Sequence, residues 1–214
     1  MPERETSTPE RETSTPERET STPERERSKP EREIALFGGS FDPPHVGHLL
    51  AAAYVLATEP IDELWLCPVF EHPLGKRPAA PFELRVDLCQ RALDDLGLAR
   101  ARVSRIEQEL GGEGRTVDLL EHLHRKHPGD RFALVLGTDL VAERPQWKRF
   151  DRIQELARII SVQRGGFSVA GEGGVVIPAI SSTAVRKQLR EGGDLSRLVP
   201  RKVLEAIRSA GAYR

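Results

Sequence analysis

Hydrophobic residues along the chain gather in short runs, separated by longer stretches in which apolar and polar positions alternate with helical spacing. Four runs of four or five mostly apolar residues predict central β-strands, at 34–37, 64–67, 132–136 and 159–162. Two weaker strand candidates are the residues around Val103 and the segment 175–177. Runs of this length and composition are typical of strands that are buried on both faces of a sheet.

Helices are expected between these strands, at 49–57, 82–96, 117–123, 184–190 and 201–209. The clearest has apolar residues stepping by four, three, four and three along one face and ends before Gly97; these are Phe82, Val86, Cys89, Leu93 and Leu96. Alternating strands and helices predict an α/β fold, a Rossmann-like, doubly wound, mostly parallel sheet with helices on both faces. A small helical segment is expected at the C-terminal end.

Residues 1–33 differ in character from the rest of the chain. The unit Pro-Glu-Arg-Glu-Thr-Ser-Thr starts at Pro2, Pro9 and Pro16 and then degenerates. No repeat position is apolar, which excludes a coiled-coil seam, a buried core and a secretory signal. We therefore expect a disordered tail at 1–33 and one folded domain at 34–214. The tail could be a solvated spacer, an interaction segment or a translated upstream repeat.

Charge and cysteine content narrow the class of protein. The tail holds ten Glu against six Arg and Lys29, which gives it a net charge of −3. Because the whole chain has a net charge of −1, residues 34–214 carry a net charge of +2. That balance argues against a nucleic-acid surface. Cys67 and Cys89 lack disulfide or metal spacing, which fits a reducing cytoplasm. The longest apolar stretch is too short for a membrane span. The oligomeric state stays open.

The segment 38–48 carries the strongest chemical signal. It reads Gly-Gly-Ser-Phe-Asp-Pro-Pro-His-Val-Gly-His and connects a predicted buried strand to a predicted helix. Gly38 and Gly39 would let the chain turn sharply and approach a phosphate closely. His45 and His48 stand one helical turn apart near the helix start, where N–H groups and the helix dipole favour an anion. The pattern predicts a binding site for the phosphates of a nucleoside triphosphate.

A second phosphate site is predicted at 180–186, Ile-Ser-Ser-Thr-Ala-Val-Arg. Ser181 or Ser182 would cap a helix that begins at Thr183 or Ala184. Arg186 would then offer a planar guanidinium to phosphate oxygens. Taken alone, the segment is more typical of a capped helix with a surface arginine, because capping serines are common and arginines are mostly exposed. The presence of the first motif favours the phosphate interpretation.

The segment 38–48 resembles the signature of the nucleotidyltransferase superfamily with the His-x-Gly-His motif. From Ile34 to about Tyr213 the chain most resembles bacterial nicotinate-nucleotide adenylyltransferases. The resemblance implies transfer of AMP from ATP to nicotinate mononucleotide, giving deamido-NAD and pyrophosphate for NAD biosynthesis. It also implies Mg²⁺ carried with ATP rather than by a protein metal site.

The resemblance further implies which residues contact ATP. His45, His48 and Arg186 would be the catalytic residues. The full set of implied ATP contacts is Gly38, Gly39, Ser40, Phe41, His45, His48, Gly137, Asp139, Ser181, Ser182, Thr183 and Arg186. Gly137 and Asp139 form the Gly-x-Asp that reaches the nucleotide ribose in this family. Lys76 either approaches the phosphates or lies on the surface.

The nicotinate end departs from the family pattern. The usual Ser-Tyr-Thr-x-Asp-Thr appears here as Gly-Arg-Thr-Val-Asp-Leu at 114–119, so Thr116 and Asp118 match. Arg115 replaces the tyrosine and could pair with the substrate carboxylate or be a solvated loop arginine. Trp147 is implied to stack on the pyridine ring, although it could also anchor a loop to the core.

Other acceptors and other roles remain as alternatives. The acceptor could be nicotinamide mononucleotide or another phosphate monoester such as phosphopantetheine. A regulatory nucleotide-binding protein with the same fold is the non-enzymatic alternative, against which intact His45, His48 and Arg186 argue. The spacing of His122, His124 and His127 does not converge on a metal, and we expect these side chains to be solvated.

Overall fold

The computed structural model describes residues 32–71, 77–111, 114–138, 147–165 and 175–214. These residues form a five-stranded sheet in the order β3-β2-β1-β4-β5, and every neighbouring pair of strands is parallel. The strands are β1 (Glu33–Gly39), β2 (Glu63–Pro68), β3 (Ala101–Val103), β4 (Arg131–Gly137) and β5 (Arg158–Val162). The predicted doubly wound, Rossmann-like fold is confirmed.

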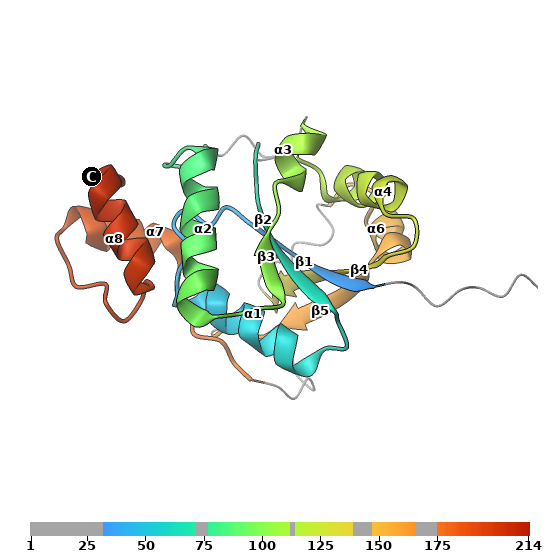
Figure 1. Ribbon diagram of the computed structural model, residues 1–214, viewed down its shortest axis with the longest axis horizontal. Coiled ribbons are helices and arrows are strands. Elements are labelled where there is room, and N and C mark those ends of the chain that lie inside the picture. The colour runs from blue at the N-terminus through green and yellow to red at the C-terminus, as the bar shows by residue number, and fades with distance from the viewer. Residues whose placement is uncertain (1–31, 72–76, 112–113, 139–146, 166–174) are drawn as a thin grey trace, which may run out of the picture.

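Helices cover both faces of this sheet (Figure 1). One face carries α1 (Val46–Thr58) and α2 (Phe82–Leu96), with α7 (Ser182–Arg190) and α8 (Arg201–Ala210) packed on the same core. The other face carries α3 (Ile106–Leu110), α4 (Thr116–Lys126) and α6 (Phe150–Leu156). Figure 1 shows α8 beside α2, at the end of the molecule away from α4 and α6.

Three local expectations were wrong. The helices α3 and α6 were not expected, because five and seven residues are too few to display a helical period. The segment 175–177 is not a strand, since Ile177 makes only a single bridge with Arg164. Val175 and Val176 are exposed instead of buried.

The strands divide the core into two parts by the alternation of their side chains. Ala35 of β1 belongs to the part that includes Ala52 and Val55 of α1. Its neighbours Ile34 and Leu36 belong to the part on the other face, with the leucines of α4. A strand buried on both faces must be apolar throughout, which is why 34–37 is a continuous apolar run.

The buried face of α2 differs from the predicted one. It consists of Arg85, Leu88, Cys89, Ala92 and Leu93. Leu96, which was assigned to that face, is 50% exposed. The face is turned because Arg85 is buried, with its guanidinium donating to the carbonyl oxygens of Ser40 at 2.8 Å, Val69 at 2.8 Å and Ala80 at 3.2 Å. Three acceptors make burial of this cation tolerable.

The strand order places the first motif at a point where ligands bind in such folds. β1 pairs with β2 on one side and with β4 on the other, so the order of the chain reverses between β1 and β4. Open α/β sheets bind ligands outside the carboxyl ends of the strands at this reversal. The segment 38–48 leaves the carboxyl end of β1 there.

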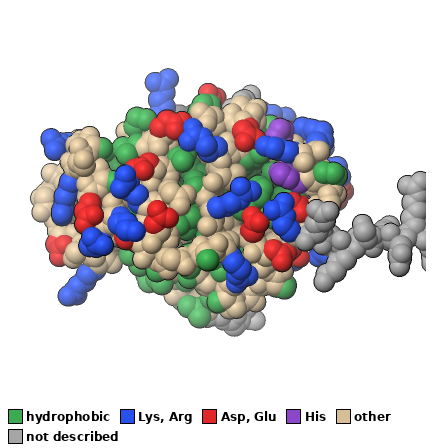
Figure 2. All heavy atoms as spheres, in the orientation of Figure 1, with side chains coloured by type: hydrophobic (Ala, Val, Ile, Leu, Met, Phe, Trp, Pro, Cys, Tyr) green, Lys and Arg blue, Asp and Glu red, His purple; other side chains and the backbone are tan. Residues whose placement is uncertain are grey.

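The surface charges and the helices fit the expectations drawn from charge balance and from the length of the apolar stretches. Figure 2 shows positive and negative side chains interspersed over the face that it presents. Among the described helices, none combines the length and the apolar character that crossing a membrane requires.

The domain includes at least two residues of the predicted tail 1–33. Glu33 belongs to β1, and Arg32 donates to the Asp130 carboxylate at 2.6 Å and to Glu63 at 3.1 Å. Residues 1–31, which make up the rest of the predicted tail, lie outside the described residues. The two residues at the boundary therefore belong to the domain.

Arg32 and the repeat that precedes it are expected to differ in their contribution to stability. We expect Arg32→Ala to lower the free energy of unfolding by about 1 kcal/mol, because the buried Asp130 carboxylate loses its closest cation while Arg32 itself is partly solvated. Deleting residues 1–31 is expected to leave the melting temperature unchanged, because that repeat has no apolar position. Urea unfolding measures the first effect, and thermal unfolding measures the second.

The matched control is Arg91→Ala. Arg91 pairs with Asp87, and both side chains are about half exposed, so its loss should destabilise the protein less than the loss of Arg32. A loss of several degrees on deleting residues 1–31 would contradict the assignment of the boundary.

Candidate active site

The loop after β1 turns at a residue other than the one predicted. Gly38 and Gly39 are still part of β1, and the left-handed backbone conformation belongs to Phe41, with a φ of 45°. The glycines are important because they leave space that a side chain would fill. A Cβ on Gly39 would lie 3.2 Å from the Phe41 ring, whereas no described residue comes within 4 Å of the corresponding position on Gly38. The chain at Gly38 is therefore open to a bulky ligand.

Phe41 supports the histidines from within the core. Its ring is fully buried and meets the His48 ring edge-on, with 4.8 Å between the centroids. It also meets Phe37 edge-on at 5.7 Å. A buried ring is not available to ATP, so the predicted contact of Phe41 would have to come from its backbone.

The two histidines of the motif lie together at the start of α1. His45 is the N-cap residue, and its backbone N–H donates to Nδ1 of His48 at 3.2 Å. The two rings stack with 3.7 Å between centroids and 19° between planes. This arrangement is similar to a capping box in which a histidine replaces the usual acid. Gly47 leaves room for it, because a Cβ there would lie 3.2 Å from the His45 ring.

Both imidazoles are neutral near pH 7. Burial lowers the pKa of His45 to about 4, and the positive charge of Arg164 contributes to the shift. Burial, His45 and Arg164 likewise hold the pKa of His48 well below its usual value. Since Nδ1 of His48 accepts a hydrogen bond, its single proton sits on Nε2. His48 is therefore an uncharged donor through Nε2.

The second predicted segment forms the start of α7. The N-cap is Ser181, whose hydroxyl accepts from the Ala184 N–H at 3.2 Å, and the helix begins at Ser182, one residue earlier than expected. The Ser182 hydroxyl donates to the carbonyl oxygen of Pro43 at 2.9 Å. Both hydroxyls are thus engaged, so phosphate contacts here would come from the N–H groups of the first turn.

Arg186 joins the two segments. Its Nη1 donates to the carbonyl oxygen of Asp42 at 2.6 Å and lies 3.4 Å from the Asp42 carboxylate. Its Nη2 donates to the Thr183 hydroxyl at 3.3 Å. The structure thus brings together the two segments that the sequence marks as phosphate sites, across more than 130 residues of chain.

Sequence reasoning missed Arg164. It follows β5 and donates through Nη2 to the carbonyl oxygen of Ile180 at 2.7 Å, while its N–H donates to the Thr138 hydroxyl at 3.2 Å. Its charge acts on both histidines. One feature of the sequence could have identified Arg164 as a site residue. It lies just after a predicted strand, at the edge of the sheet where ligands bind. Of the predicted ribose contacts, Gly137 ends β4, and Asp139 lies outside the described residues.

The predicted nicotinate segment lies at the same edge of the sheet. Gly114 has a φ of 62°, and a Cβ there would lie 2.3 Å from the carbonyl oxygen of Glu71, which follows β2. Arg115 is the N-cap residue of α4, with Thr116 and Asp118 in its first turn. Arg115 is half-buried and so is not a freely solvated loop residue.

Trp147 packs partly against the second core cluster and meets Phe150 edge-on at 6.2 Å. Both roles considered for it from the sequence, loop anchor and stacking partner, are compatible with this half-buried position. Lys76 lies outside the described residues.

The expectation that His122, His124 and His127 are solvated was wrong. None of His122, His124 and His127 is fully exposed, and Nε2 of His124 bonds to the carbonyl oxygen of Leu156 at 2.7 Å. This contact ties α4 to α6. Within the described ranges, no group of three or more His, Cys, Asp or Glu side chains is arranged to hold a metal ion.

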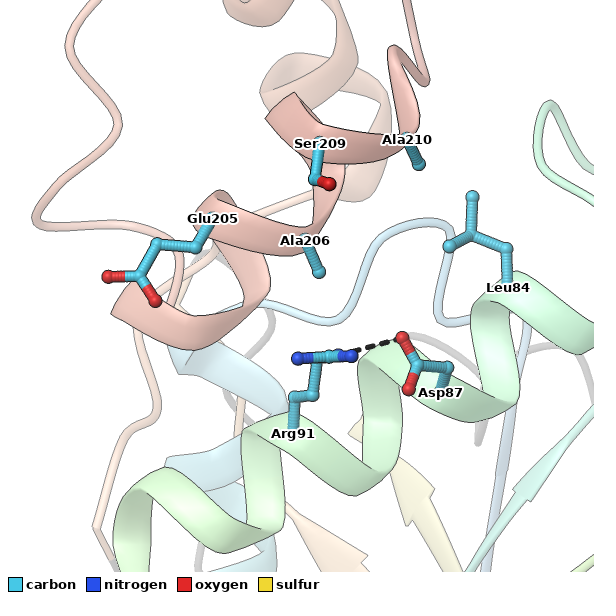
Figure 3. A pocket seen from close by; sticks show the side chains of 7 residues that line it. All are labelled: Leu84, Asp87, Arg91, Glu205, Ala206, Ser209 and Ala210. Carbon is cyan, nitrogen blue, oxygen red and sulfur yellow. Dashed lines mark hydrogen bonds and ion pairs between the residues drawn. The ribbon is translucent and has the colours of Figure 1, made fainter.

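A surface hollow of about 360 Å³ lies between α2 and α8 (Figure 3). It is lined by Leu84, Asp87, Arg91, Glu205, Ala206, Ser209 and Ala210. None of these was predicted to bind substrate, and the cation Arg91 is paired with Asp87 at 2.7 Å. The hollow marks the packing of α8 on α2 rather than a part of the phosphate site.

Comparison with known proteins decides the family. A family model described as Cytidylyltransferase-like matches residues 36–188, a span that contains both phosphate segments. The chain belongs to the cytidylyltransferase-like family.

Relatives of this cytidylyltransferase-like chain share one name. A protein of Anaeromyxobacter dehalogenans (strain 2CP-1) is 49% identical over 185 residues, which cover 85% of this chain and 97% of the relative. A protein of Myxococcus xanthus (strain DK1622) is 43% identical over 181 residues, with coverages of 85% and 94%. Both are named "Probable nicotinate-nucleotide adenylyltransferase".

A solved structure supports the fold. Plasmodium falciparum nicotinic acid mononucleotide adenylyltransferase, complexed with NaAD, matches with a TM-score of 0.72 at 20% identity. The match covers 85% of this chain and 97% of that chain.

The neutrality of His45 predicts how stability depends on pH. Between the pKa of a free histidine, about 6.5, and that of His45, the unfolded chain binds a proton that the folded chain rejects. Stability therefore falls as the pH drops from 7 toward 4, and for this one group the loss between pH 7 and 5 is about 2 kcal/mol.

We expect His45→Asn to reduce this dependence, with His48 supplying the remainder. Urea unfolding of both proteins at pH 7, 6 and 5 gives the two slopes. Equal slopes for wild type and variant would contradict the assignment of a buried, neutral His45.

Proposed function

We propose that this protein is a nicotinate-nucleotide adenylyltransferase, which transfers AMP from ATP to nicotinate mononucleotide and releases deamido-NAD and pyrophosphate. The observation that carries the proposal is the docking of the start of α7 on the loop after β1, through Ser182 to Pro43 and Arg186 to Asp42. It joins two anion-binding segments in one site, which is what a polyphosphate substrate requires. The names of the relatives support the choice of acceptor.

In the proposed reaction, an oxygen of the mononucleotide phosphate attacks the α-phosphorus of ATP. A new P–O bond forms, the bond to the bridging oxygen of the β-phosphate breaks, and pyrophosphate leaves with the electron pair. The attacking oxygen is already ionised, so no general base is needed. Catalysis then consists of positioning and of stabilising charge on the phosphates.

Each side chain has a distinct part in this proposal. The Nε2–H of His48 donates to an oxygen of the α-phosphate, and the stacked His45 holds that ring and faces the bridging oxygen. Arg186 and the N–H groups of Ser182 and Thr183 bind the leaving pyrophosphate. The backbone at Gly38, Gly39, Ser40 and Phe41 borders the phosphates, with space at Gly38.

The remaining assignments complete the substrates. Gly137 and Asp139 contact the ribose of ATP, and Arg115, Thr116, Asp118 and Trp147 bind the pyridine mononucleotide. Mg²⁺ arrives with ATP and neutralises phosphate charge, because it prefers phosphate oxygens and retained waters. Two buried thiols, Cys67 and Cys89, fit work in the reducing cytoplasm.

A direct test mixes protein and Mg-ATP with each acceptor and measures pyrophosphate release. We expect activity with nicotinate mononucleotide and at least tenfold lower kcat/KM with the amide, since a desolvated charge-assisted pair is worth about 1.5–3 kcal/mol. Arg115→Ala should narrow that difference. A preference that survives Arg115→Ala would assign the selectivity to N–H groups near Thr116. Equal use of acid and amide, or activity only with phosphopantetheine, would overturn the proposed acceptor.

His48→Ala tests the proposed donor. We expect turnover to fall by a factor on the order of 100, the usual effect of removing one preorganised donor to developing charge. His127→Ala, a change of the same kind at a half-buried histidine without a proposed role, should retain wild-type turnover. The melting temperatures of both variants show that they are folded. Near-wild-type turnover of His48→Ala would remove this residue from the mechanism.

A further inference from the structure

The carboxylate of Asp42 is a buried junction in the loop after β1. Its side chain is 3% exposed. Its Oδ2 accepts from the Ala79 N–H at 2.7 Å and lies 3.4 Å from Nη1 of Arg186. Its Oδ1 accepts from the Ala80 N–H at 3.0 Å and from the hydroxyl of Tyr213 at 2.9 Å. Each oxygen thus has two donors, which fixes the plane of the carboxylate.

Tyr213 reaches this junction from beyond α8. Its residue is 9% exposed and belongs to the main core cluster. Its φ is 66°, a left-handed backbone conformation that non-glycine residues seldom adopt and that surrounding contacts must hold in place. Burial and the neighbouring Asp42 raise the pKa of the phenol, so the hydroxyl keeps its proton and remains a donor.

The position of Tyr213 is set independently of the phosphate site. The helix α8 packs on α2 around the hollow of Figure 3, and the N–H of Lys202 donates to Asp95 of α2 at 2.8 Å. Gly211 ends α8 with a φ of 60° and turns the chain back toward the core. The hydroxyl of Tyr213 is therefore a fixed point against which the loop can be aligned.

We propose that Tyr213 is a positioning residue for the pyrophosphate end of the site, acting on Arg186 through Asp42. The donor from Tyr213 holds Oδ1, and this turns Oδ2 and the Asp42 carbonyl toward Nη1 of Arg186. The guanidinium N–H groups that do not bind Asp42 are then held in a single orientation. This inference rests on the proposed role of Arg186 in binding pyrophosphate. Tyr213 lies outside the residues 36–188 that match the family model.

The reverse reaction tests the inference, because pyrophosphate is then a substrate with its own kinetic constants. Deamido-NAD and pyrophosphate are converted to ATP and nicotinate mononucleotide, and ATP is measured. The variant is Tyr213→Phe, which removes the hydroxyl and keeps the ring in the core. We expect kcat/KM for pyrophosphate to fall about tenfold, as for the loss of one buried hydrogen bond to a charged group, while the KM for deamido-NAD changes less than twofold.

The matched control is Tyr54→Phe, the same chemical change at a half-buried tyrosine of α1. It should leave both constants at wild-type values. A purely structural role of Tyr213 would lower the melting temperature and affect both substrates of the reverse reaction alike, and that result would overturn the inference.

A double-mutant cycle separates this inference from the proposed function. In an Arg186→Ala background, Tyr213→Phe is expected to cause less than a twofold further change, because a residue that acts through Arg186 has nothing left to position. Additive effects of the two substitutions would overturn the inference. If Arg186→Ala alone left pyrophosphate kinetics unchanged, the proposed role of Arg186 would fail. If Arg186→Ala were impaired and Tyr213→Phe behaved as wild type, only the inference would fail.

Discussion

The rest of the site depends on the burial of one carboxylate, that of Asp42. A buried charge without partners is very costly, so the segments that supply its donors are held where the donors can reach it. Those donors come from the chain before α2, from α7 and from the segment after α8. A single side chain thus fixes the relative position of three parts of the molecule that are distant in sequence.

A buried cation fixes the same loop from the other side. Arg85 of α2 donates to the carbonyl oxygens of Ser40, Val69 and Ala80, all three of which lie outside the helices and strands. Backbone carbonyls in such loops must be satisfied when they are buried. Arg85 does this at the base of the loop. The backbone at Gly38, on the other hand, is exposed.

The sequence predicted what depends on neighbours along the chain. The four long apolar runs are strands, His45 and His48 lie at a helix start, and the sheet is parallel with helices on both faces, as the alternation of strands and helices predicted. Contacts between distant residues could not be predicted in this way. Tyr213 and Asp42 are 171 positions apart, and no local pattern marks a tyrosine after a helix as the partner of a loop aspartate.

The failures on α2 and on the short helices have the same origin. The period of α2 was read from apolar residues alone, whereas its buried face includes Arg85, whose burial is possible only because loop carbonyls surround it. The helices α3 and α6 are stabilised by packing on the second core cluster, not by their own short sequences. Tertiary contacts therefore decided the structure wherever the local signal was weak or mixed.

The hydrogen bond between the His45 N–H and Nδ1 of His48 links the start of α1 to the chemistry of the site. It satisfies one of the N–H groups at the helix end, and at the same time it forces the proton of His48 onto Nε2. Protonation of Nδ1 would set two donors against each other and break this contact. In the proposed reaction, the positive charge that a polyphosphate requires comes from Arg164, whose charge acts on both histidines, and from Arg186, which joins the two phosphate segments. The separation of roles follows: neutral rings orient hydrogen bonds, and the arginines supply charge.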